Sequence, residues 1–78
     1  MINCIITSPI ETSNYDELQS IVIPTSSGQM QVLENHAETF VLLKKGNITL
    51  QKNNKEEKRI QVNEGSCHIK DNLITIFI

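Results

Sequence analysis

The side chains best suited to acid–base chemistry gather around one histidine. His36 lies between Glu34 and Glu38, in a polar segment that leads into an apolar run. A catalytic histidine needs a nucleophile and an orienting carboxylate close to it in space. The two glutamates provide carboxylates, but no recognisable triad accompanies them. We favour a structural histidine that hydrogen-bonds the backbone and holds its loop, and a small enzyme remains an alternative.

Two cysteines and two histidines raise the question of a zinc site; they are Cys4, His36, Cys67 and His68. Zinc ligands usually come in pairs two to four residues apart. Cys67 and His68 are adjacent, and adjacent side chains of a strand point to opposite faces. Both cysteines stand in apolar alternating runs, where cysteine behaves as a small hydrophobe. We expect two buried thiols and no metal. A disulfide bridge is the minor alternative for the cysteines, and a metal protein using His36, Cys67 and His68 is another.

Other sources of chemistry are weak. The three glycines lie far apart and form no phosphate-binding loop. The net charge of -2, from 7 basic and 9 acidic residues, comes without a basic patch, which argues against nucleic acid as a partner. No apolar stretch reaches the roughly 18 residues of a membrane span, and the N-terminus lacks the features of a signal peptide. We therefore expect no cofactor, no insertion into a membrane, and a protein that stays where it is made.

The elements that must position these residues are strands. Ile, Val and Thr make up 22 of the 78 residues, and Ala37 is the only alanine. Branched side chains favour a pleated surface over a helix. Apolar residues alternate with polar ones in the runs that contain Ile48 and Leu50, Ile60 and Val62, and Ile74 and Ile76. Residues 40–43 are apolar at every position, which predicts a strand covered on both faces.

Turn signals separate these runs. Gly28, Gly46 and Gly65 punctuate boundaries, and Asn53-Asn54 and Asp71-Asn72 tolerate left-handed backbone angles. Residues 10–18 allow two interpretations: a loop entering an edge strand, which we favour, or a short helix capped by Ser13. The mixed charges of residues 52–59 indicate a solvated hairpin tip. Several short strands at this spacing predict a sandwich or barrel.

The order of motifs along this chain resembles that in the N-terminal domain of ATP synthase epsilon subunits. Residues 18–37 follow that family's pattern of a strand ending near proline, a glycine turn, Val-Leu and His-Ala. Further matches are Thr7-Ser8-Pro9, Leu43-Lys44-Lys45-Gly46-Asn47-Ile48, Val62-Asn63-Glu64-Gly65-Ser66-Cys67-His68-Ile69 and Asp71-Asn72-Leu73-Ile74-Thr75-Ile76. Departures fall mostly in loops: Glu34-Asn35 replaces Pro-Gly, Gln31 and Glu64 each replace a Gly, Glu38 replaces a Pro and Ser66 an aromatic residue. The resemblance spans essentially the whole chain.

The resemblance implies a single domain, residues 1–78: an all-β, flattened antiparallel β-sandwich of about ten short strands. It implies a non-catalytic rotor subunit in the central stalk of a proton-translocating ATP synthase, bound to the gamma subunit and to the ring of c subunits. Such a subunit is peripheral, on the cytoplasmic face of the cell membrane or the equivalent inner face of an organelle. The C-terminal helical domain of typical members is expected to be absent, because the chain stops at Ile78. A stand-alone interaction adaptor is the alternative.

The resemblance also assigns two surfaces. The loop of Ser26, Ser27, Gly28, Gln29 and Met30 corresponds to the family loop that faces the c-ring. The region of His36, Ala37 and Val41 corresponds to the family surface near gamma. We expect Gly28 and His36 to shape these loops while Gln29, Met30 and their neighbours make contacts.

Overall fold

The branched residues form strands along the whole chain, as the alternation predicts. The computed structural model describes residues Met1–Ile78 and contains eight strands and no helix. The strands are β1 Ile2–Thr7, β2 Thr12–Thr25, β3 Gly28–Val32, β4 Thr39–Leu43, β5 Gly46–Lys52, β6 Glu57–Val62, β7 Gly65–Lys70 and β8 Leu73–Phe77. Consistent with this, no helix is long and apolar enough to cross a membrane.

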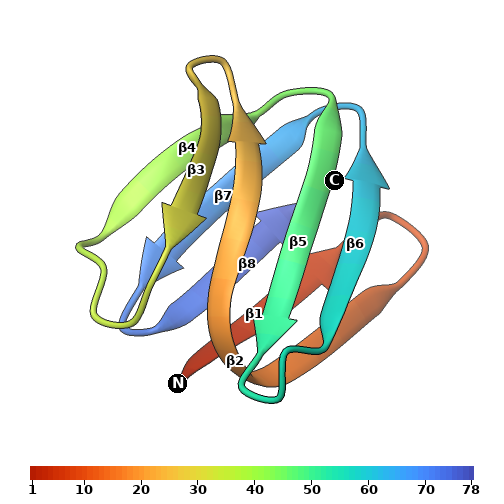
Figure 1. Ribbon diagram of the computed structural model, residues 1–78. Helices are drawn as coiled ribbons and strands as arrows, with labels where there is room; N and C mark the ends of the chain where they lie inside the picture. Colours follow the sequence, from red (N-terminus) through yellow and green to blue (C-terminus); the bar gives the residue numbers. More distant parts are fainter.

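The strands pack as two layers (Figure 1). One layer holds β3, the C-terminal half of β2, β5 and β6, and the other holds β4, β7, β8, β1 and the N-terminal half of β2. The predicted all-β sandwich is confirmed. The strand count is eight against an expected ten or so, and β2 is one long strand that serves both layers. Every pairing is antiparallel except that of β1 with β8, which is parallel.

A bulge lets β2 pass from one layer to the other. The pairing of β1 with β2 shifts register between Ile2 and Cys4, and Glu17 adopts a φ of 56° there. The backbone N–H of Glu17 donates to Asn3 Oδ1 at 3.2 Å, which holds the bend. Bulges of this kind increase local twist and redirect a strand. The favoured interpretation of residues 10–18 is therefore confirmed, with the strand beginning at Thr12.

A core of 15 buried apolar residues lies between the layers. Ile21 and Ile48 of one layer and Ile74 and Ile76 of the other are fully covered. Burial of one such side chain stabilises the fold by about 1.5–3 kcal/mol. Ile48 stands between the polar Asn47 and Thr49, so the strand period alone places it inside.

Strand β4 differs from its prediction. It pairs with β7 along its whole length, but with β2 only where Leu43 meets Thr25. Leu43 is buried and Val41 packs against the core. Phe40 and Leu42 point the other way and keep 76% and 72% of their surface exposed. The expectation of a strand covered on both faces is wrong for the chain by itself.

Candidate functional site

The hairpin tip that joins β2 to β3 is held by one threonine. Thr25 Oγ1 donates to the carbonyl of Gly28 at 2.7 Å and accepts from the N–H of Ser27 at 3.2 Å. Gly28 has a φ of 109°, a conformation that only glycine adopts without strain. These contacts present Ser26 and Ser27 to solvent in a defined shape.

An open groove of about 530 Å³ lies between this hairpin and β4. The hairpin lines it with Thr25, Ser26, Ser27, Gln29 and Met30, and β4 lines it with Phe40, Val41 and Leu42. Met30 and Val41 also pack against the core, so they form the floor of the groove. The structure thus brings Val41, which sequence reasoning grouped with His36, beside the predicted ring-facing loop.

His36 and Ala37 lie in a different concavity. Its lining comes from the loop before β4 and from the β7–β8 turn: Asn35, His36, Ala37, Glu38, Lys70, Asp71 and Asn72. His36 Nδ1 donates to the carbonyl of Ala37 at 2.8 Å. The N–H of Asn35 donates to Asn72 Oδ1 at 2.6 Å, and Asn72 Nδ2 donates back to Asn35 Oδ1 at 3.4 Å. These bonds fasten the loop to the turn, which supports the structural interpretation of His36.

Neither flanking glutamate orients His36. Glu34 pairs with the N-terminal ammonium of Met1, and Glu38 pairs with His68. A general base is held in one tautomer by a hydrogen-bonded orienting group, and His36 has only a neighbouring backbone carbonyl in that role. The arrangement around His36 therefore matches a loop anchor better than a catalytic dyad.

The two cysteines are buried and unbridged in the core, as predicted. Burial raises the pKa of the Cys4 thiol to about 12, with Cys67 adding to the effect, and raises the pKa of Cys67 to about 11. A thiol must lose its proton to bind zinc. Cys67 points into the core, and His68 points to the opposite face of β7. The four candidate ligands thus do not converge, and no group of three or more His, Cys, Asp or Glu side chains could hold a metal ion.

Sequence reasoning missed an apolar surface on the outer side of β4, β7 and β8. Two rows cross these strands, Leu42–Ser66–Phe77 and Phe40–His68–Thr75, and we call their six residues the β4–β7–β8 face. Leu42 and Phe77 stand on either side of the small Ser66, and Phe77 is 50% exposed. The signal for this face was the run of residues 40–43, which is apolar at every position.

A histidine and a glutamate complete this face. The imidazole of His68 stacks on the Phe40 ring, and its Nε2 donates to Glu38 Oε2 at 2.9 Å. The hydrogen bond from His68, and then the charge of Lys70, hold the pKa of Glu38 below its usual value. The imidazole of His68 is thus held between the Phe40 ring and the Glu38 carboxylate.

The outer face of the other layer is polar. Its exposed or half-exposed strand residues include Gln31, Thr49, Arg59 and Gln61. The exposed Phe40, Leu42 and Phe77 make the β4–β7–β8 face the more apolar of the two outer faces, and exposed apolar patches mark interaction surfaces.

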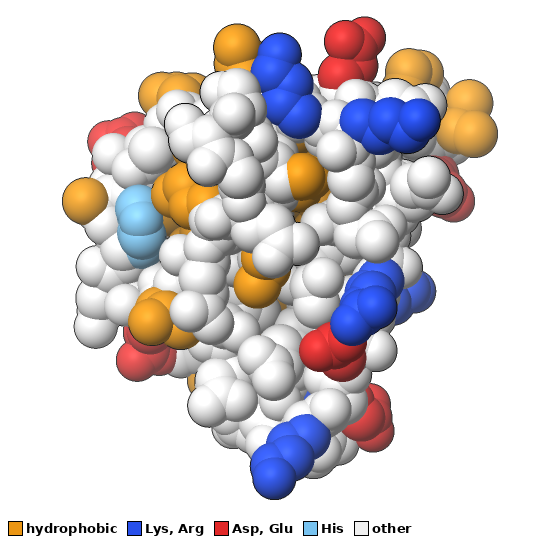
Figure 2. Space-filling view, turned by 45° about the horizontal axis from the view of Figure 1, so that its top comes forward, with side chains coloured by type: hydrophobic (Ala, Val, Ile, Leu, Met, Phe, Trp, Pro, Cys, Tyr) orange, Lys and Arg blue, Asp and Glu red, His pale blue; other side chains and the backbone are white.

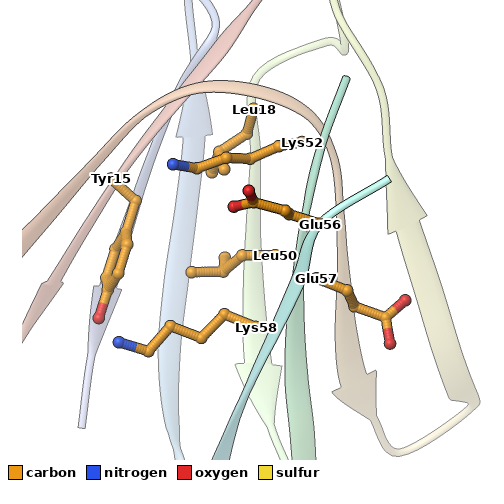
Figure 3. A pocket seen from close by; sticks show the side chains of 7 residues that line it. All are labelled: Tyr15, Leu18, Leu50, Lys52, Glu56, Glu57 and Lys58. Carbon is orange, nitrogen blue, oxygen red and sulfur yellow. The ribbon is translucent and has the colours of Figure 1, made fainter. Parts of the chain in front are cut away.

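A third concavity of about 270 Å³ opens between the layers on the β6 side (Figure 3). Leu18 and Leu50 form its floor, and charged residues of both signs stand at its rim: Lys52, Glu56, Glu57 and Lys58. The ammonium of Lys58 lies 5.2 Å from the ring centre of Tyr15. The rim thus carries two positive and two negative side chains, so its charge favours neither anions nor cations.

Comparison with protein families matches the whole chain, residues 1–78, to the model described as "ATP synthase, Delta/Epsilon chain, beta-sandwich domain". Among curated proteins, the chain is similar to the ATP synthase epsilon chain of Campylobacter curvus, with 36% identity over 61 residues. It is also similar to the chloroplastic ATP synthase epsilon chain of Chlorella vulgaris, with 35% identity over 63 residues. These alignments cover 78% and 81% of this chain but 47% and 46% of the relatives. The chain therefore spans about half the length of these relatives.

Solved structures show the same fold. A chain of the Euglena gracilis mitochondrial ATP synthase, solved with OSCP, F1 and the c-ring, superimposes with a TM-score of 0.88 at 24% identity, covering 97% of this chain and 49% of that one. A chain of the Tetrahymena thermophila mitochondrial ATP synthase central stalk and c-ring superimposes with a TM-score of 0.79 at 13% identity, covering 97% and 61%. At these identities the likeness concerns the fold alone.

Proposed function

Because this chain belongs to the ATP synthase delta/epsilon chain family, as its β-sandwich domain, we propose that it joins the gamma subunit to the c-ring in the central stalk of a proton-translocating ATP synthase. In this role it is a non-catalytic rotor component that needs no cofactor. It sits peripherally on the cytoplasmic face of the cell membrane, or on the equivalent inner face of an organelle membrane. Its task is to transmit torque without deforming.

The exposed apolar residues of the β4–β7–β8 face are the observation that carries this proposal. Phe40 and Leu42 are each more than 70% exposed on a strand whose composition suits coverage on both sides. A chain of 78 residues has a thin core and gains stability from a partner that covers such a face. We assign this face to gamma.

This assignment refines the gamma-facing region implied by the resemblance. Phe40 and Leu42 make the contacts, and Val41 supports them from the inner side of β4. His36 and Ala37 lie at the start of β4, where the hydrogen bonds of their loop hold the entry to the strand. The ring-facing contacts remain with Ser26, Ser27, Gln29 and Met30, on a loop shaped by Gly28.

The fold suits torque transmission. The core is close-packed between two layers, and closely packed interiors deform little under load. Strand β2 runs through both layers without a break, so the hairpin tip and the β4–β7–β8 face belong to one continuous body.

The test is a pull-down of the chain with recombinant gamma subunit from the same source. We expect stoichiometric capture by the wild type and a large loss for Leu42→Asp, because a carboxylate on this face would be desolvated by the partner. Gln61→Asp is the matched control, since Gln61 is exposed on the polar outer face and should bind as the wild type does.

Two results decide between this function and the stand-alone adaptor. Failure of the folded wild-type chain to bind gamma would favour the adaptor. Binding that Leu42→Asp leaves unchanged would remove the β4–β7–β8 face from the gamma interface. Circular dichroism of both variants shows whether the fold is intact in each case.

A further inference from the structure

Two lysines stand beside the ring-facing hairpin tip. Lys44 and Lys45 form the turn between β4 and β5, at the same end of the sandwich as the β2–β3 hairpin (Figure 1). Both side chains are exposed. Figure 2, in which this end comes forward, shows basic side chains, with an acidic one among them, along its upper edge.

The lysine turn is fixed against the hairpin. The N–H of Lys44 donates to the carbonyl of Pro24 at 3.0 Å. Gly46 approaches Pro24 so closely that a Cβ on Gly46 would lie 2.8 Å from the proline Cβ. Pro24 directly precedes Thr25, whose hydroxyl holds the tip. The two turns therefore move as one unit, and a partner that meets the tip also meets the lysines.

The two lysines at this end form no ion pair. Residues 24–31, which include the whole tip, carry no charged side chain. Neither Lys44 nor Lys45 takes part in an ion pair; the three pairs of the chain involve Glu34, Glu57 and Glu38. Glu64 shares a groove with Lys44 but does not pair with it. The surface thus combines a neutral tip with two free ammonium groups.

We propose that Lys44 and Lys45 extend the ring-facing surface and bind carboxylates on the loops of the protein that the hairpin tip docks against. This inference rests on the proposed function for the identity of that partner. The neutral tip supplies shape and neutral hydrogen bonds, while the lysines supply the charge that orients the encounter. Complementary charge of this kind acts chiefly on specificity and on the association rate.

Acidic protein loops fit this surface better than anionic lipid. Lipid recognition by basic residues takes clusters of roughly four to eight Lys or Arg, at about 1 kcal/mol each. Two lysines with an acidic neighbour fall short of that number. Two well-placed carboxylates, in contrast, can satisfy both ammonium groups directly.

The experiment compares the chain with the double variant Lys44→Glu/Lys45→Glu, each bound to gamma and titrated with the purified c-ring. Salt concentration is varied from low to physiological. We expect the wild-type complex to lose ring affinity as salt rises, and the double variant to bind about tenfold more weakly at low salt, with that difference shrinking as salt rises. The control is Lys52→Glu/Lys55→Glu, around the β5–β6 turn at the opposite end, which should bind the ring as the wild type does.

The outcomes separate this inference from the proposed function. If the double variant binds the ring with wild-type affinity and wild-type salt dependence, the lysines make no contact and the inference is wrong, while the function stands. If the wild type binds neither gamma nor the ring, the proposed function fails. Binding to vesicles with anionic lipid is titrated in parallel for the wild type and the double variant. If the double variant loses vesicle binding but keeps wild-type affinity for the ring, the inference is overturned in favour of a lipid contact.

Discussion

The ring of Phe40 lies flat on the imidazole of His68, with 4.2 Å between the ring centres and 7° between the planes. The two residues are direct neighbours across β4 and β7. Their stack leaves Phe40 rigid but exposed. A rigid aromatic side chain in an apolar surface is a favourable anchor for a protein partner.

Truncation of this anchor should separate binding from stability. In Phe40→Ala, we expect the free energy of unfolding to fall by less than about 1.5 kcal/mol, the value of an aromatic pair. Affinity for gamma should fall at least about tenfold, as at interface hot spots. Urea unfolding and a binding titration measure the two quantities. A variant that loses most of its stability and keeps its affinity would place Phe40 in the fold and not in the interface.

The hydrogen bond from His68 to Glu38 should be visible in a titration. It holds the pKa of Glu38 below its usual value, with help from Lys70. We expect the Glu38 carboxyl carbon, followed by NMR, to titrate at higher pH in His68→Ala than in the wild type. The sign follows from linkage: a depressed carboxyl pKa stabilises the folded state above the unfolded pKa, and this contribution is lost as pH falls through the folded pKa.

The matched control for this titration is Lys70→Ala, which removes a contribution to the lowered Glu38 pKa that ranks below the His68 hydrogen bond. It should raise the Glu38 pKa by less than His68→Ala does. The reverse order would mean that the charge of Lys70, rather than the hydrogen bond, determines the ionisation of Glu38.

Substitution of Gly28 tests the hairpin tip. Space around its Cα is open, with no atom within 4 Å of an added Cβ, but its φ of 109° disfavours any side chain. We expect Gly28→Ala and Gly28→Val to cost similar amounts, about 1–3 kcal/mol of stability, because the cost is backbone strain. Both should weaken ring binding more than gamma binding. Thermal unfolding gives the first comparison; a much larger loss for valine than for alanine would show that crowding, not φ, is responsible.

The buried thiols predict a loss of stability at alkaline pH. Cys4 and Cys67 have folded-state pKa values of about 12 and about 11, against 9.0 for an unperturbed thiol. At pH values between the unperturbed pKa and the folded-state pKa of each thiol, the unfolded chain releases a proton that the folded chain keeps. The free energy of unfolding should therefore fall as pH rises above about 9, by up to about 1.4 kcal/mol per pH unit for each thiol.

Urea unfolding between pH 8 and pH 10.5 measures this slope. The control is Cys67→Ala, which should remove one thiol's share of the slope while lowering stability at every pH. At pH 8, labelling of the native chain by a thiol reagent should be far slower than labelling in urea. Fast labelling of the folded chain would contradict the burial of both cysteines.

Much of the fold follows from local sequence. The alternation around Ile48 and Leu50, and around Ile74 and Ile76, predicts which face of each strand is inside. Asp71 and Asn72 both take positive φ in the β7–β8 turn, as their residue types allow. The adjacency of Cys67 and His68 is enough to send them to opposite faces of β7. These features depend on chain geometry over a few residues, which is why the sequence by itself determines them.

Other features depend on which strands become neighbours. The exposure of Phe40 and Leu42 arises because no other strand packs against the outer side of β4 and β7. The pairing of Glu38 with His68, thirty residues apart, exists only because β4 and β7 are adjacent. The same holds for the contact that fixes Lys44 against Pro24. Long-range strand pairing is set by the packing of the whole core, so only the tertiary structure could place the candidate binding surfaces.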